Sequence, residues 1–222
     1  MRYLNSSMET DFCSDNPTDE VHPSVYSKLK RLIDVLGALV GLSITSIVFI
    51  PLAILIKLDS TGPIFFHQKR CGLKGEVFTI TKFRSMTVDA EKKRHLVSNQ
   101  AKGHIFKNHQ DPRITKVGKI IRSCSLDEFP QFWNVLKGDM SLVGTRPPTP
   151  QEVSYYNSYH LLRLNVKPGL TGEWQVKGRS HILDFEEIVA LDLEYQRKWS
   201  VKYDLILILK TIAVVLKKTG AV

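Results

Sequence analysis

Two adjacent carboxylates, Asp127 and Glu128, lie in the stretch SLDEFPQFWNVLKGDMSLVGTRPP, among cationic side chains. The candidate cations around them are Lys82, Arg84, Arg122 and Arg146. Carboxylates among cations suit phosphoryl transfer, because the cations hold phosphate oxygens while one carboxylate attacks phosphorus and the other holds Mg²⁺. We expect a helix start and nearby arginines to keep Asp127 ionised, as a nucleophile must be. Glu128 alone is sufficient for Mg²⁺, which often takes only one or two protein carboxylates.

The same acidic pair also has a purely structural explanation. Ser125 and Glu128 match the S-x-x-E capping box, and carboxylates in a first turn complement the helix dipole. A helix is predicted to follow, because apolar residues recur at i, i+3, i+4 and i+7 before a glycine stop. These residues are Phe129, Phe132, Trp133, Leu136 and Gly138. Pro130 makes Phe129 a second candidate for the cap, so the capping and catalytic interpretations both stay open.

Two short β-rich runs precede the acidic pair. Residues 64–70 and 77–84 flank a glycine-containing turn, which predicts a β-hairpin. Strand alternation places Lys82 and Arg84 on one face. The two cations either meet an anion jointly or lie solvated at the strand end.

The segment between the hairpin and the acidic pair has two parts. Residues 87–112 are polar and weakly patterned, and the sequence does not resolve their structure. In RITKVGKIIRS, by contrast, Val117, Ile120 and Ile121 have helical spacing. The second part therefore predicts a helix that ends near Arg122.

Residues 32–56 form the longest apolar stretch and contain a single charge, Asp34. The uncharged run after Asp34 is long enough for a membrane helix. Pro51 cannot donate to the carbonyl four residues earlier, so we expect the helix to kink or stop there, only about 24 Å from Asp34. Basic residues flank both ends and favour the cytosolic side, so a re-entrant helix is favoured over a straight span. A second apolar stretch, residues 205–216, is too short to span and predicts either an interfacial helix or a core helix.

The chain of 222 residues has 31 Lys and Arg against 22 Asp and Glu, a formal net charge of +9. This excess predicts an anionic partner such as a membrane surface, a nucleic acid or a phosphorylated substrate. Nucleic acid is disfavoured because the positive charge flanks the apolar stretches. Residues 1–24 are acidic instead and predict a flexible tail. Three distant cysteines and scattered histidines support neither a disulfide framework nor a zinc site.

Several long motifs occur together and in one order. They are KRLID at 30–34, DSTGPIFFHQKRCGLKGEVFTITKFRSM at 59–86, RSCSLDEFPQFWNVLKGDMSLVGTRPP at 122–148 and KPGLTGEWQVKGRS at 167–180. In these motifs the chain resembles the bacterial monotopic phosphoglycosyl transferases, also called polyprenyl-phosphate sugar phosphotransferases. The resemblance covers nearly all of residues 28–221. It implies an α+β, mainly helical fold with a re-entrant membrane helix, a helix-associated β-hairpin and interfacial amphipathic helices.

The resemblance implies a two-step reaction on a UDP-sugar. Asp127 matches the first residue of the family's Asp-Glu dyad and would attack the sugar-bearing phosphate, expelling UMP. Undecaprenyl phosphate would then take the sugar phosphate from the aspartate. Glu128 would bind the required Mg²⁺. Lys82, Arg122 and Arg146 match family positions that contact phosphates or support the dyad.

The C-terminal third resembles members that start surface polysaccharides by transferring hexose-1-phosphate or N-acetylhexosamine-1-phosphate. Gln175 and Arg179 either line the nucleotide-sugar pocket or belong to a structural loop. Asp204 matches another acidic site position of the family, or simply caps its helix. The resemblance places the enzyme on the cytosolic face of the bacterial inner membrane. Larger members carry four additional N-terminal membrane helices, so this chain resembles the minimal form.

These elements divide the chain into an acidic tail (1–24), a re-entrant helix region (25–58) and a catalytic domain with a C-terminal interfacial helix (59–222). Two other functions stay open. One is a membrane-bound scaffold that binds anionic lipid. The other is a magnesium-dependent nucleotide-sugar hydrolase in which Asp127 activates water. The sequence does not determine the sugar, the polysaccharide, or whether the chain forms a homodimer.

Overall fold

The computed structural model describes residues 21–178 and 181–217, so the predicted acidic tail up to residue 20 lies outside the described residues. The described chain is α+β and mainly helical, as predicted. Its helices are α1 (Lys28–Asp59), α2 (Lys116–Ser123), α3 (Phe132–Lys137), α4 (Pro150–Val153), α5 (Ser158–Leu161), α6 (Glu173–Lys177), α7 (Phe185–Lys198) and α8 (Val201–Leu216). Short 3₁₀ helices cover Pro23–Val25, Leu73–Gly75, Arg94–Leu96, Leu126–Gln131 and Leu162–Asn165.

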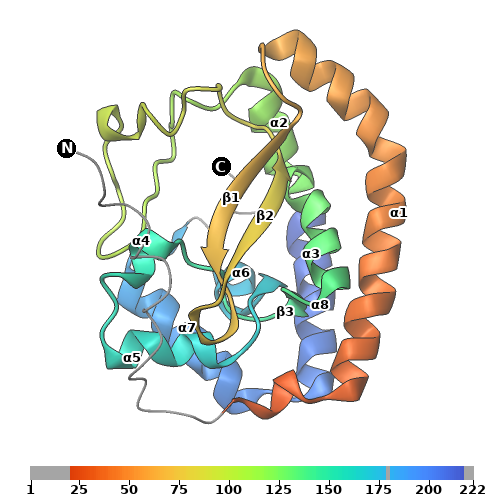
Figure 1. The fold of residues 1–222 in the computed structure, drawn as a ribbon, viewed down its shortest axis with the longest axis vertical. Coiled ribbons are helices and arrows are strands. Elements are labelled where there is room, and N and C mark those ends of the chain that lie inside the picture. The colour runs from red at the N-terminus through yellow and green to blue at the C-terminus, as the bar shows by residue number, and fades with distance from the viewer. Residues whose placement is uncertain (1–20, 179–180, 218–222) are drawn as a thin grey trace, which may run out of the picture.

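The described strands form two small sheets. The strands are β1 (Phe65–Cys71), β2 (Val77–Phe83), β3 (Ser141–Val143) and β4 (Gly169–Thr171). β1 and β2 make the predicted antiparallel hairpin, and β3 pairs in parallel with β4. Figure 1 shows α1 along one edge of the molecule, the hairpin lying between α1 and the helices α4, α5 and α7, and α3 and α8 next to α1.

The hairpin is held against α1 by side chains of β2. Ile80 packs with Ala38 of α1 in one buried cluster. Phe83 packs with Leu52 and Ile56 of α1 in another, and both β2 residues are 1% exposed. Burial of these apolar groups fixes the hairpin along the length of α1.

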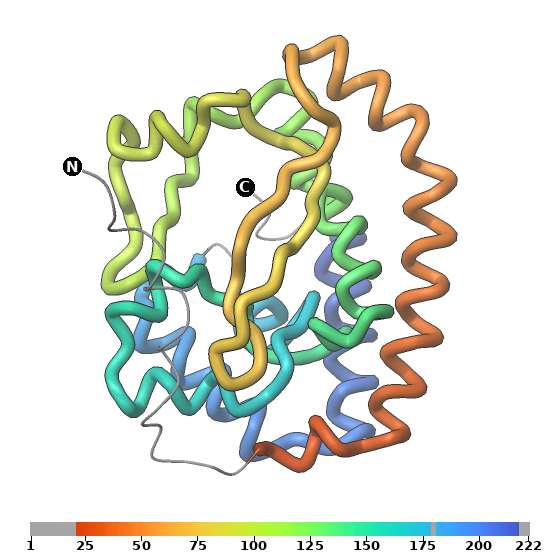
Figure 2. The backbone as a smooth tube through the Cα atoms, viewed as in Figure 1, coloured from red at the N-terminus to blue at the C-terminus, as the bar shows by residue number. Residues whose placement is uncertain are grey.

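α1 is the one helix in the described part of the chain that is long and apolar enough to cross a membrane, by length and composition. The prediction at Pro51 was a kink or a stop, and the stop does not occur because the helix runs unbroken through this residue. Figure 2 shows that its orange C-terminal part curves instead. Its exposed large aliphatic side chains include Leu36, Val40, Ile47, Ile50, Ile54 and Leu58. Such an apolar surface favours an apolar surrounding, and the re-entrant path stays a prediction.

The N-terminal half of α1 is fixed by buried polar contacts. Asp34 accepts hydrogen bonds from Ser141 Oγ at 2.9 Å and from the backbone N–H of Leu142 at 2.8 Å. Lys30 forms an ion pair with Asp204 of α8 at 2.7 Å. Buried charges are costly unless they are paired or hydrogen-bonded, so these contacts specify how α1 sits against β3 and α8.

The predicted helix after Ser125 is confirmed only in part. Ser125 has a φ of 55° and makes no side-chain capping bond to the helix, so the capping-box prediction is wrong. Leu126–Gln131 is a 3₁₀ helix and α3 begins only after it, because Pro130 has no N–H to donate to a carbonyl four residues earlier. Gly138 ends α3 with a φ of 98°, as predicted. Trp133 of the predicted apolar stripe is 55% exposed.

The other two predicted helices are present. The helix that ends near Arg122 is α2, and the apolar stretch at residues 205–216 lies in α8. Leu209, Ile212 and Leu216 of α8 are exposed. This exposure is compatible with the interfacial placement of α8, which stays a prediction.

We predict that Asp34→Ala destabilises the protein by about 2 kcal/mol, because it leaves buried hydrogen-bond donors without an acceptor. Thermal unfolding in detergent measures the effect as a lower Tm. Asp89→Ala is the matched control, since Asp89 is exposed and lies 3.9 Å from Lys92. Equal Tm values for the two variants would contradict the anchoring role of Asp34.

Candidate active site

A cavity of about 290 Å³ opens beside the hairpin. Its walls come from both strands of the hairpin, the segment after β2, the end of α2, the first turn of the 3₁₀ helix that contains Asp127, and the segment before and within α4. The cationic residues that line it are Arg70, Lys82, Arg84, Arg94, Arg113, Arg122 and Arg146, and the acidic ones are Glu91, Asp127 and Glu152. This excess of cations suits a ligand with several negative charges.

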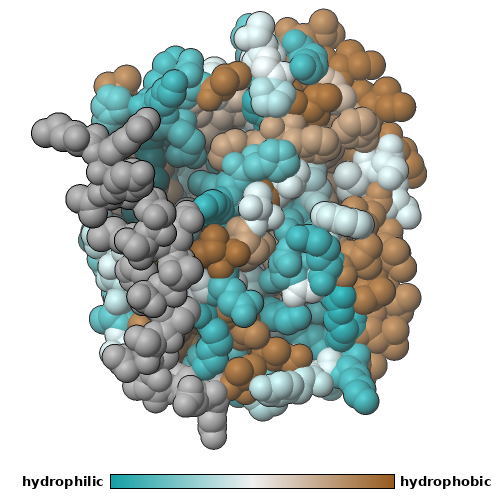
Figure 3. Space-filling view, in the orientation of Figure 1, coloured by the Kyte–Doolittle hydropathy of each residue, from teal (hydrophilic) through white to brown (hydrophobic). Residues whose placement is uncertain are grey.

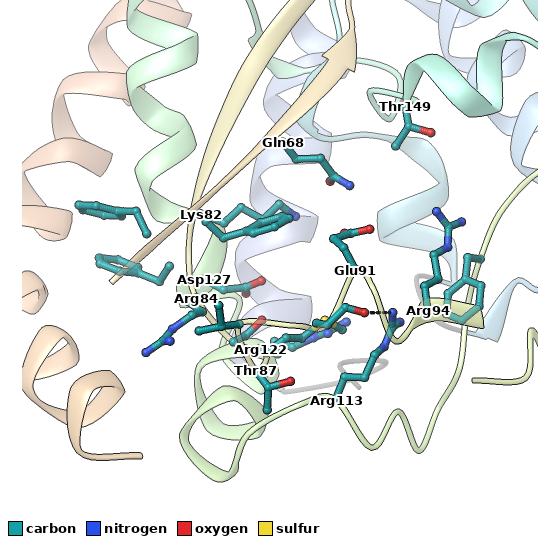
Figure 4. Close-up of a pocket in the computed structure, with 18 of the residues that line it drawn as sticks. Gln68, Lys82, Arg84, Thr87, Glu91, Arg94, Arg113, Arg122, Asp127 and Thr149 are labelled. Atoms are coloured by element: carbon teal, nitrogen blue, oxygen red, sulfur yellow. Dashed lines mark hydrogen bonds between the residues drawn. The ribbon is translucent and has the colours of Figure 1, made fainter. Parts of the chain in front are cut away.

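Asp127 lies at the inner wall of this cavity and is only 9% exposed. Figure 4 shows it between Lys82 and Arg122. Burial, followed by the neighbouring charge of Glu128, raises the pKa of the Asp127 carboxyl to about 6, and the charges of Lys82 and Arg122 only partly oppose this. The expected effect of the cations is therefore present but smaller than that of burial. At pH 7 the carboxyl is still ionised in a ratio of about ten to one, and a more basic carboxylate is a stronger nucleophile.

Glu128 forms an ion pair with Lys82, one of the two cations beside Asp127. Its Oε1 accepts a hydrogen bond from Lys82 Nζ at 2.6 Å, and 38% of its side chain is exposed. Lys82 reaches it because β2 packs directly along the 3₁₀ helix. The two adjacent carboxylates thus occupy different environments, one buried and one accessible.

Arg146 forms a second cationic wall with Arg70. Arg146 Nη1 lies 3.2 Å from Glu152 Oε2, and Arg70 Nη1 donates to the Pro147 carbonyl at 2.8 Å. Burial, with Arg146 nearby, lowers the pKa of Arg70 to about 10, so it remains charged at neutral pH. The sequence reasoning missed Arg70. Arg70 pairs with Phe78 in the hairpin, and Phe78 lies on the same face of β2 as Lys82. Strand alternation and hairpin pairing could therefore have placed Arg70 beside Lys82.

Arg84 lines the cavity but uses its guanidinium elsewhere. Its Nη2 donates to the Ser60 carbonyl at 2.7 Å and its Nη1 donates to the Thr61 carbonyl. The side chain thereby caps the C-terminal end of α1. A joint contact of Arg84 and Lys82 with an anion stays a prediction, and both residues line the cavity. Sequence periodicity predicts the strand face on which Arg84 lies. It does not predict the contact of Arg84 with the carbonyls of Ser60 and Thr61, which lie more than twenty residues earlier in the chain.

Three of the predicted site residues, Glu128, Gln175 and Asp204, are not among those that line this cavity. Gln175 lies in α6 and Asp204 in α8. Asp204 is 2% exposed and accepts a hydrogen bond from Tyr195 Oη at 2.8 Å in addition to its ion pair with Lys30. Ser200 rather than Asp204 caps α8. Arg179 lies outside the described residues.

The donor set fits Mg²⁺ only together with a phosphate ligand. Among residues 21–178 and 181–217, no group of three or more His, Cys, Asp or Glu side chains could hold a metal ion. Mg²⁺, however, commonly combines one or two carboxylates with substrate phosphate oxygens and water. Glu128 is an accessible carboxylate beside phosphate-attracting cations, so it fits that pattern.

A cationic cavity with a buried, basic carboxylate, on a chain with a long apolar helix, fits an enzyme site for a phosphorylated substrate. The sequence matches the family described as bacterial sugar transferase over residues 25–218. The chain belongs to the bacterial sugar transferase family, which confirms the resemblance found in its motifs.

Three curated proteins illustrate this relationship. The galactosyl transferase CpsE of Streptococcus agalactiae is 56% identical over 200 residues, which cover 88% of this chain and 44% of that protein. The undecaprenyl-phosphate galactose phosphotransferase of Salmonella typhimurium is 40% identical over 199 residues, which cover 87% and 41%. The exopolysaccharide production protein ExoY of Sinorhizobium fredii is 34% identical over 100% of both chains. The chain therefore spans less than half of the first two relatives and the whole length of the third.

We predict that Glu128→Gln lowers the pKa of the Asp127 carboxyl below about 6, because it removes the adjacent negative charge that raises this pKa. A ¹³C NMR titration of labelled aspartate carboxyls, without added divalent cation, measures the change. Asp89→Asn removes an exposed carboxylate and serves as the control. An unchanged or higher Asp127 pKa in Glu128→Gln would contradict the electrostatic description of the pair.

Proposed function

We propose that this chain transfers a sugar-1-phosphate from a UDP-sugar to undecaprenyl phosphate at the cytosolic face of the bacterial inner membrane, and so starts a surface polysaccharide. The observation that carries the proposal is the buried Asp127 carboxylate, basic but ionised at neutral pH, in a cationic cavity. The relationship to CpsE and to the Salmonella galactose phosphotransferase makes UDP-galactose the first donor to test. The proposed class of donor is a UDP-hexose or a UDP-N-acetylhexosamine.

In the first step, a carboxylate oxygen of Asp127 attacks the sugar-bearing phosphorus of the donor. A bond forms between this oxygen and phosphorus, and the bond from phosphorus to the bridging oxygen of the diphosphate breaks. UMP leaves with the electron pair, and the sugar phosphate stays on the aspartate. Lys82, Arg122 and Arg146 neutralise charge on the phosphate oxygens, which are the groups that develop charge in phosphoryl transfer.

In the second step, a phosphate oxygen of undecaprenyl phosphate attacks the same phosphorus. The bond to Asp127 breaks, the carboxylate is restored, and a new diphosphate links the lipid to the sugar. Mg²⁺ held by Glu128 would supply further charge neutralisation on the phosphates. The Glu128 carboxylate would then contact both the Lys82 amine and Mg²⁺.

The membrane part of the proposal rests on α1. Its exposed aliphatic side chains match the hydrocarbon region. The packing of β2 on α1 and the Arg84 contact with the end of α1 hold the cavity at a fixed position relative to that surface. The polyprenyl tail of the acceptor can then stay in lipid while its phosphate reaches Asp127. The division into residues 25–58 and 59–222 is part of this proposal.

A hydrolytic role has one observation in its favour. A carboxyl with a pKa of about 6 is also suited to act as a general base towards water. Both reactions release UMP from a UDP-sugar, but only the transferase forms a lipid-linked sugar diphosphate. The lipid product therefore separates the two functions.

We predict that the detergent-solubilised protein, given Mg²⁺, undecaprenyl phosphate and UDP-galactose or another UDP-sugar, releases UMP and forms the lipid product. Asp127→Asn removes the nucleophile and should lower the rate at least about 10³-fold. Asp89→Asn is the control and should retain the wild-type rate. UMP release without lipid product indicates hydrolysis. Absence of UMP release from UDP-galactose and from every other UDP-sugar tested overturns the proposed function.

We further predict that chelation by EDTA abolishes UMP release and that added Mg²⁺ restores it, because the phosphate charges are then neutralised again. Glu128→Gln should raise the Mg²⁺ concentration for half-maximal activity by about tenfold. The Mg²⁺ dependence of the initial rate measures this shift. An identical Mg²⁺ dependence for wild type and Glu128→Gln would remove Glu128 from the proposed metal site.

A further inference from the structure

One wall of the cavity comes from the segment between β2 and α2, which the proposed reaction has not used so far. The backbone N–H of Thr87 donates to the Arg113 carbonyl at 3.0 Å. Arg113 Nη1 donates to the Ala90 carbonyl at 2.9 Å, which is the dashed line at Arg113 in Figure 4. Arg113 Nε and Nη2 both donate to Asp111. All three nitrogens of this guanidinium therefore hold the wall itself in place.

Arg94 on the same wall is used differently. Its guanidinium carbon lies 5.0 Å from the centre of the Phe106 ring, and that of Arg113 lies 5.3 Å from the same centre. Within the part of the chain that the structure describes, no residue accepts a hydrogen bond from the Arg94 guanidinium or forms an ion pair with it. Phe106 thus orients a planar cation whose N–H donors remain available to a ligand.

Glu91 adds an acceptor to this wall. It lines the cavity, and no described residue forms an ion pair with its carboxylate. Figure 4 shows Glu91 and Arg94 on one side of the cavity, with Arg84 and Asp127 on the other. The wall therefore presents a flat cation and a hydrogen-bond acceptor at a distance from the carboxylate that attacks phosphorus.

The two proposed substrates must approach the cavity from different sides. Figure 3 shows hydrophobic side chains gathered along the α1 edge, and Phe65 of the cavity stacks on Phe49 of α1 with ring centres 5.8 Å apart. The apolar α1 side of the cavity therefore suits the polyprenyl chain of the acceptor. Figure 1 shows the yellow-green segment before α2 reaching to the opposite edge of the molecule. This more polar wall is left for the water-soluble donor.

We propose that Arg94, Phe106 and Glu91 form the subsite for the nucleoside end of the donor. The inference rests on the proposed function. The uracil ring is flat, with carbonyl oxygens that accept hydrogen bonds, so it suits a guanidinium that can stack and donate. Glu91 accepts a hydrogen bond from a ribose hydroxyl or from the uracil N–H. The diphosphate then extends towards Arg122 and Asp127.

The first test measures UMP binding by calorimetry, which does not depend on turnover. Arg94→Met should weaken UMP binding about tenfold, because both stacking and charge-assisted hydrogen bonds are lost. Arg94→Lys keeps the charge but loses the plane, so it should also weaken UMP binding. Glu91→Gln should weaken UMP binding too, and Lys93→Met is the exposed, neighbouring control that should leave it unchanged.

Inorganic phosphate serves as the second probe, because it lacks the nucleoside. Arg94→Met should leave phosphate binding unchanged. An equal loss of phosphate and UMP affinity would make Arg94 a general anion site, and unchanged UMP affinity would exclude it from the donor site. Either result overturns the inference.

Steady-state kinetics separate this inference from the proposed function. Arg94→Met should raise the KM for the UDP-sugar about tenfold, with kcat within about twofold and the KM for undecaprenyl phosphate unchanged, as expected for lost ground-state binding. A higher KM for undecaprenyl phosphate instead would assign the wall to the acceptor and overturn the inference. If the wild type releases no UMP from any donor, the proposed function fails, while UMP calorimetry still tests Arg94.

Discussion

Burial of one negative charge is the constraint on which this structure depends. Asp127 loses most of its hydration, and a carboxylate in that position is unstable unless opposite charges compensate it. The compensating cations are Lys82 from β2 and Arg122 from the last turn of α2. The hairpin, α2 and the 3₁₀ helix must therefore pack together before the site exists, and the resulting balance leaves a carboxylate that is both ionised and basic at neutral pH.

The same elements tie the site to the long apolar helix. Ile80 and Phe83 of β2 pack against α1, and Arg84 caps its C-terminal end. Asp59 at the end of α1 accepts a hydrogen bond from the backbone N–H of Val117 in α2 at 2.9 Å. Both elements that carry the compensating cations thus contact α1 directly. Under the proposed function, this coupling sets the position of the nucleophile relative to the lipid surface that supplies the acceptor.

Local periodicity was sufficient to predict several parts of the fold. The hairpin, α2 and the glycine stop after α3 each follow from spacing within a short window, and these predictions are confirmed. The 3₁₀ helix was not predicted, because the S-x-x-E spacing and the apolar spacing after it both match an α-helix, and only the missing N–H of Pro130 argues against one. The strands β3 and β4 have three residues each and pair across a long sequence separation, so no local pattern marks them.

Side-chain roles were harder to predict than elements. The motif resemblance and the charge pattern named Asp127, Lys82, Arg122 and Arg146, and the structure brings these side chains to one cavity. Glu128, Gln175 and Asp204 are not among the residues that line that cavity. Glu128 pairs with Lys82, Gln175 lies in α6, and Asp204 of α8 pairs with Lys30 of α1. The size of the Asp127 pKa shift depends on burial, which is a property of the assembled fold and is not present in any sequence window.

The central claim is that Asp127 itself bonds to phosphorus. Rapid acid quench of the wild-type protein with UDP-sugar and Mg²⁺, without acceptor lipid, followed by peptide mass spectrometry, tests it most directly. The account predicts that the peptide containing Asp127 gains the mass of one sugar phosphate, and that added undecaprenyl phosphate removes this mass. UMP release without any such adduct at the earliest quench times would contradict the account, because water rather than Asp127 would then attack the donor.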